Sequence, residues 1–158
     1  METTFETTTV DAIVPAKDDT LALWNPTAAA LWSLLFSPAL GAWLVMRNWQ
    51  RLGKPDKARQ ALCWFVGVLV LNLGNSIVIT AAAIQGREAG LPFWAPLVVL
   101  LAWIAISAYP QIRHIDDHHG ETYARRSWAG PLLIALAILV CVSLLSTVVA
   151  GYQSAAGA

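Results

Sequence analysis

Residues 26–46 read PTAAALWSLLFSPALGAWLVM, and residues 47–59 read RNWQRLGKPDKAR. The first stretch has no charged residue and is long enough for one helix across a bilayer, which takes about 20 residues. The second stretch is basic, and Lys and Arg beside a span are retained on the cytoplasmic side. Together the two stretches predict a membrane protein with a defined orientation.

Three more apolar stretches follow, at about 61–84, 91–109 and 128–152, again without charged residues. The chain has 158 residues and only 13% of them are charged, roughly half the share in a soluble domain. We therefore expect an all-α fold, a four-helix transmembrane bundle with short turns. A polar, acidic N-terminal tail at 1–25 precedes it, and a frayed C-terminus at 153–158 follows.

The first span contains an interruption that leaves two interpretations open. Asn25 and Pro26 suit a helix start, but Pro38 removes a backbone hydrogen bond in the middle of the stretch. One interpretation is a single kinked span over 26–46. The other is a re-entrant hairpin, which would keep the N-terminus on the side of the basic loop. We expect the single span, because two half-spans need more length than this stretch offers.

The distribution of Lys and Arg predicts the orientation. The third loop has Arg113, Arg125 and Arg126, whereas the N-terminal tail has only Lys17 and the second loop only Arg87. The first loop holds the largest group: Arg47, Arg51, Lys54, Lys57 and Arg59. We expect a multi-pass protein of the cell inner membrane with loops 47–60 and 110–127 in the cytoplasm and both termini on the opposite side.

All three histidines of the chain lie in one short segment, HIDDHH at 114–119. On a helix, His114 and His118 share a face, a geometry that can hold a transition metal. The spacing resembles one histidine box of membrane di-iron desaturases and hydroxylases, but those enzymes need several boxes and no other histidine is present. A single metal ion on His114, Asp117, His118 and His119 remains one interpretation; a solvated polar turn is the other.

The second span has a polar face made of Asn72, Asn75, Ser76 and Thr80, spaced by three or four residues. Asn within a span seeks a hydrogen-bond partner, so this face predicts either a contact between helices or the lining of a solute path. The same spans lack acidic and basic residues, which argues against proton-coupled carriers and pumps because they rely on such charges.

The basic residues of the first loop, 47–59, offer a contact for anionic lipid heads or for a partner, in addition to fixing topology. Net charge is zero, and we expect no binding to nucleic acid. Cys63 and Cys141 lie in apolar spans and form neither a disulfide framework nor a zinc motif.

Trp24-Asn-Pro, Phe36-Ser-Pro-Ala-Leu-Gly-Ala-Trp43 and Asn48-Trp-Gln-Arg-Leu-Gly53 resemble the opening of a family of small uncharacterised bacterial four-span inner-membrane proteins. The resemblance covers the first span and its basic turn only. It implies a bacterial inner-membrane setting and transfers no functional residue.

These observations favour a non-enzymatic function without a cofactor: a membrane scaffold, partner or regulatory subunit that acts through helix association and its basic cytoplasmic loops. Its expected partners are the lipid bilayer and either further copies of the chain or another membrane protein. An oligomeric channel or facilitator for uncharged solutes, lined by the polar face of the second span, is the alternative. A metal-dependent membrane enzyme that uses residues 114–119 is the third hypothesis.

Overall fold

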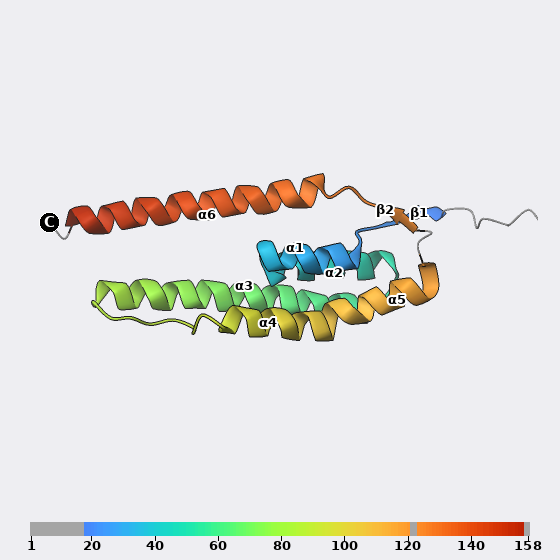
Figure 1. The fold of residues 1–158 in the computed structure, drawn as a ribbon, viewed down its shortest axis with the longest axis horizontal. Coiled ribbons are helices and arrows are strands. Elements are labelled where there is room, and N and C mark those ends of the chain that lie inside the picture. The colour runs from blue at the N-terminus through green and yellow to red at the C-terminus, as the bar shows by residue number, and fades with distance from the viewer. Residues whose placement is uncertain (1–17, 121–122, 157–158) are drawn as a thin grey trace, which may run out of the picture.

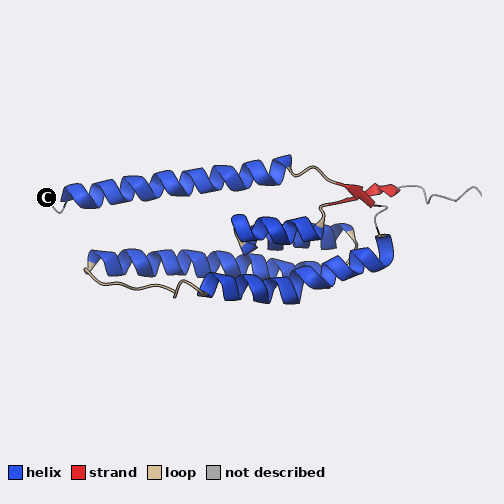
Figure 2. Cartoon of the chain, in the orientation of Figure 1, coloured by secondary structure: helices blue, strands red, loops and turns tan. Residues whose placement is uncertain are grey.

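The computed structural model describes residues 18–120 and 123–156, and these are mostly helical, which confirms the all-α class (Figure 1). The elements follow in the order β1 (Asp18–Leu23), α1 (Pro26–Leu35), α2 (Pro38–Arg51), α3 (Pro55–Ile84), α4 (Ala95–Trp103), η1 (Ile104–Ala108), α5 (Tyr109–His119), β2 (Tyr123–Arg125) and α6 (Ala129–Ala156). β1 and β2 form a two-stranded parallel sheet at one end of the helices (Figure 2).

The prediction of a single kinked span over 26–46 is wrong, because α1 and α2 form a helical hairpin. The backbone amide of Trp24 donates to Asn48 Oδ1 at 3.1 Å, whereas a straight helix would hold these residues about 36 Å apart. α1 and α2 lie side by side in Figure 1. The chain therefore returns to the end from which it started, as the re-entrant interpretation requires.

The reversal follows from the residues at its tip. Phe36 ends α1 and Ser37 is extended, with φ at 178°. Ser37 Oγ then accepts the amide of Ala39 at 3.1 Å and caps α2, with Pro38 at its first helical position. Gly41 has no Cβ, and a Cβ there would collide with Ser33 of α1 and the ring of Trp103. Glycine thus permits the close approach of three helices.

α3 contains the expected second span and begins earlier, at Pro55. The third expected span also differs at its ends, because α4, η1 and α5 form one helix that continues through Pro110 to His119. η1 is a π-helical turn in which the Tyr109 amide donates to Ile104 O, five residues back. This wider turn precedes Pro110 and accommodates a residue that would otherwise end the helix.

The N-terminal approach to α1 lies at the same end of the molecule as the two basic loops. β1 pairs with β2, the Arg126 amide donates to Leu23 O at 2.9 Å, and Leu23 is fully buried. The expectation that both termini face away from those loops is therefore wrong for residues 18–25; residues 1–17 lie outside the described part of the chain. α6 ends at the other end, near the α3–α4 connection (Figure 1).

Burial is concentrated where the hairpin meets α3 and the α4–η1–α5 helix. The core includes Val45, Trp49, Ala61 and Trp103. By contrast, α6 stands apart from the other helices (Figure 1), and the residues from Leu136 to Gly151 are exposed. Within the described ranges, three helices are long and apolar enough to cross a membrane, at Pro55–Ile84, Ala95–His119 and Ala129–Gly151.

Candidate functional site

Asn48 of α2 and Gln111 of α5 form a buried polar pair, which we call the amide clamp. Both side chains are fully buried. Asn48 Nδ2 donates to Gln111 Oε1 at 3.2 Å and to the carbonyl of Trp24 at 2.7 Å. Gln111 Nε2 donates in turn to the carbonyl of Val45 at 2.9 Å. The clamp therefore joins the hairpin, the approach to α1 and the long α4–η1–α5 helix.

Trp24 connects the amide clamp to the segment before α6. Its backbone amide and carbonyl are both bonded to Asn48, and its indole Nε1 donates to Ser127 O at 3.1 Å. The guanidinium of Arg126 lies over the Trp24 ring at 4.3 Å, within the range of a cation–π interaction. The ring of Trp43 also contacts that of Trp24, with the two ring centroids 6.0 Å apart.

The amide clamp has a structural role and offers no reactive group. The side-chain oxygen and nitrogen of both Asn48 and Gln111 are engaged in hydrogen bonds. A fully satisfied buried network specifies one arrangement of its segments. Asn48 and Gln111 are absent from the site residues that the sequence predicts. The one signal was an amide in register with the apolar face of α2, one turn after Val45 and next to Trp49.

The histidine segment is helical, and the expectation that His114 and His118 share a face is confirmed. Their ring centroids are 4.3 Å apart, and the Trp49 ring lies 5.2 Å from that of His114. His118 Nδ1 lies 3.0 Å from the carbonyl of His114, so this nitrogen is directed at the backbone. Within residues 18–120 and 123–156, no three His, Cys, Asp or Glu side chains gather closely enough to hold a metal ion. Asp117 is exposed on the same helix.

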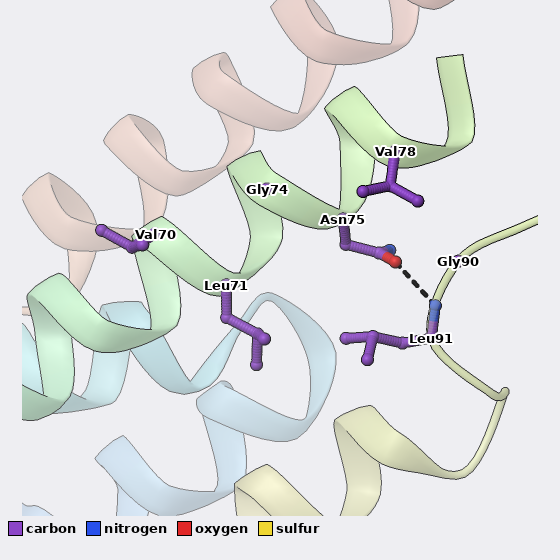
Figure 3. Close-up of a pocket in the computed structure, with 7 residues that line it drawn as sticks. All are labelled: Val70, Leu71, Gly74, Asn75, Val78, Gly90 and Leu91. Atoms are coloured by element: carbon purple, nitrogen blue, oxygen red, sulfur yellow. Dashed lines mark hydrogen bonds between the residues drawn. The ribbon is translucent and has the colours of Figure 1, made fainter. Parts of the chain in front are cut away.

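The polar face of α3 divides into two parts. Asn75 Oδ1 accepts the amide of Leu91 at 2.7 Å and so anchors the connection between α3 and α4 (Figure 3). The hydroxyl of Thr80 donates to the carbonyl of Ser76 at 2.9 Å, within its own helix. Asn72 is exposed. In the single chain these residues do not meet around an enclosed path.

Two open grooves follow α3 on the side of α4. The first, of about 470 Å³, is lined by Val70, Leu71, Gly74, Asn75, Val78, Gly90 and Leu91 (Figure 3). The second, of about 460 Å³, reaches from Gln60 to Val99 and shares Leu71 with the first. Gly90 has a φ of +126°, and a Cβ there would collide with Ile79. Glycine therefore lets the connection approach α3 beside Asn75.

The structure separates the basic residues of the first loop into two groups. Arg51 Nη1 donates to the carbonyl of Ala22 at 3.0 Å, and the Arg47 guanidinium lies 5.7 Å from the Trp43 ring. Arg51 thus joins the end of α2 to β1, and Arg47 makes a contact within α2. Lys54, Lys57 and Arg59 surround the start of α3 and are exposed. We refer to these three as the basic collar.

The basic collar lies at the N-terminus of α3. Cations there interact unfavourably with the helix dipole. Its side chains have no hydrogen bond or ion pair with the described residues. Helix stability therefore does not account for it.

The comparisons with known proteins add no relative: neither a family model, nor a curated protein, nor a solved structure matches this chain.

Proposed function

We propose that this chain is a non-enzymatic scaffold or regulatory partner in the bacterial inner membrane. It has three crossings, α3, the α4–η1–α5 helix and α6, and a re-entrant hairpin that enters from the cytoplasmic side. α1 and α2 have 10 and 14 residues, or about 15 and 21 Å, which is shorter than the hydrocarbon core of about 30 Å.

The observation that carries the orientation is the position of the positive charges. Among the ten Lys and Arg, those at the end with the sheet and the amide clamp are Arg47, Arg51, Lys54, Lys57, Arg59, Arg113, Arg125 and Arg126. Arg87 is at the other end, in the α3–α4 connection. Because Lys and Arg near spans are retained inside, the sheet end is cytoplasmic, and the end of α6 is on the opposite side.

The scaffold function is supported by what each polar group already does. The polar groups of the amide clamp and of Trp24 are already engaged in hydrogen bonds that hold the fold. The rings of His114 and His118 contact each other, and His114 contacts Trp49. The surface left over is the basic collar, where three cations surround a helix N-terminus. This combination suits an anionic group of an acidic partner protein.

A photo-crosslinking side chain at Gln50, which is exposed beside the collar, tests the proposal in native membranes. We expect a discrete protein adduct at position 50, none at Arg87, and loss of the adduct in the triple variant Lys54→Gln/Lys57→Gln/Arg59→Gln. An adduct that persists in that variant, or crosslinks to lipid alone, would contradict the scaffold function.

A further inference from the structure

Asn72 is an amide in the uncharged part of α3 whose side chain finds no hydrogen-bond partner among the described residues of the single chain. It lies midway between Ala61 and Ile84, at the centre of the uncharged part of α3, and it is exposed. Its side chain has no hydrogen bond with the described residues. Hydrocarbon provides neither donor nor acceptor, so an amide at this depth needs a protein partner.

The neighbouring polar groups do not meet this need. Asn75 is engaged by the amide of Leu91, and the Thr80 hydroxyl by the carbonyl of Ser76. On α6, Ser146 and Thr147 donate to the carbonyls of Val142 and Leu144 in their own helix. These three hydroxyls are thus committed to their own helices, and Asn72, one turn from Ser76, is left without a bond to any of them.

We propose that α3 pairs with α3 of a second copy of this chain, with Asn72 opposite Asn72 across a two-fold axis. A carboxamide carries both donors and an acceptor, so two of them satisfy each other when symmetry brings them together. The inference goes beyond the proposed function, because it adds a second copy of the chain, paired through α3, to the acidic partner proposed for the basic collar.

The surface around Asn72 suits such a contact. Residues at spacings of three and four on this side of α3 are all exposed: Leu69, Asn72, Ser76, Thr80 and Ala83. Ser76, Thr80 and Ala83 are small, which lets two helix backbones approach closely, as interfaces between membrane helices require. The basic collar lies at the cytoplasmic start of the same helix, so the dimer places two collars side by side.

Single-cysteine crosslinking tests the pairing. In a Cys63→Ser/Cys141→Ser background, Ser76→Cys keeps Asn72 and lies on the proposed interface, whereas Ile77, which is 60% exposed, lies about 100° farther round α3. Mild oxidation in native membranes is expected to give a disulfide-linked dimer for Ser76→Cys and a monomer for Ile77→Cys. Equal yields at both positions, or no dimer from Ser76→Cys, would overturn the pairing.

The amide itself is tested by dissociation of fluorescently labelled chains in detergent micelles. Asn72→Leu is expected to weaken dimerisation about three- to thirtyfold, the range for one interhelical polar contact, while Asn72→Gln retains most of it. Unchanged tryptophan fluorescence in Asn72→Leu shows that the fold is intact. Unchanged dimerisation in Asn72→Leu would overturn the inference. The scaffold function is tested separately, by the photo-crosslinked adduct at position 50.

Discussion

The two ends of this molecule treat the same chemical group in opposite ways. At the end with the β-sheet, Asn48 is fully buried and bonded to Trp24 and Gln111. Toward the other end, Asn72 is exposed on α3. The difference shows that burial within the chain, and not residue type, decides which amide holds the fold and which is left for association.

The same contrast appears between whole helices. α2 is amphipathic and packs against α1, α3 and η1, whereas α6 is apolar throughout and is exposed from Leu136 to Gly151. A soluble protein would have to cover such a helix. In a membrane, lipid covers it at no cost, so an apolar helix needs no partner in its own chain.

The largest expected effect is from Asn48→Leu. This change leaves the amide and carbonyl of Trp24 and the Oε1 of Gln111 without their partner, and an unsatisfied buried group costs about 1–3 kcal/mol. We expect a loss of about 3 kcal/mol or more in the free energy of unfolding, measured by titration with denaturing detergent. The matched control is Asn72→Leu, which should leave the stability of the monomer nearly unchanged. Similar losses in the two variants would remove the distinction between the two amides.

Gly41→Ala is expected to have the next largest effect. The new methyl group would collide with Ser33 and Trp103, and overpacking of this kind costs about 1–3 kcal/mol. Gly67→Ala is the control, because Gly67 is helical and its Cβ would meet open space; it should be neutral or slightly stabilising. Thermal unfolding in the same detergent compares them. If Gly41→Ala were as stable as Gly67→Ala, the close crossing of α1, α2 and Trp103 would be absent.

Arg126→Gln tests the connection between Trp24 and the segment before α6. The charge over the indole is 4.3 Å from the ring centroid, and a partly exposed cation–π pair contributes about 1 kcal/mol. We expect a loss of that size, whereas Arg125→Gln, at an exposed neighbouring position, should have little effect. A larger loss for Arg125→Gln would show that Trp24 does not hold Arg126.

The smallest expected effect is from Asn75→Leu. The change removes the acceptor for the Leu91 amide, a contact of about 0.6 kcal/mol by analogy with other membrane helices. Trypsin cleavage after Arg87 in the released connection should become severalfold faster. Ser76→Leu, one residue along the helix, should leave the cleavage rate unchanged, and a rate that rises equally in both variants would argue against the anchor.

Much of the fold was accessible from the sequence, because long uncharged apolar runs have few structural outcomes. The run at 61–84 predicts α3, and 128–152 predicts α6. The hairpin was available as an alternative, and it was set aside because two half-spans need more length than 26–46 offers, but α2 runs on to Arg51. α1 and α2 need not cross, since they meet the other helices partway along them, at Gly41 and Trp103.

The candidate site was less accessible, since its residues are joined by long-range contacts. Gln111 bonds Val45 and Asn48 across more than sixty positions in the chain, and no local pattern marks such a pair. The expected third span ended at 109, before Pro110, and the π-helical turn that accommodates this proline has no sequence signature. The histidines stood out by type, yet their helix places the rings of His114 and His118 in tilted contact with each other and His114 beside Trp49.

The side on which residues 18–25 lie tests the account most directly. Single cysteines at Thr20, Gln50 and Arg87, in the Cys63→Ser/Cys141→Ser background, can be labelled with a membrane-impermeant maleimide in intact cells and again after lysis. The re-entrant hairpin predicts that Thr20→Cys and Gln50→Cys react only after lysis, and that Arg87→Cys reacts in intact cells. Labelling of Thr20→Cys together with Arg87→Cys in intact cells would show that residues 26–46 cross the membrane and would contradict the hairpin.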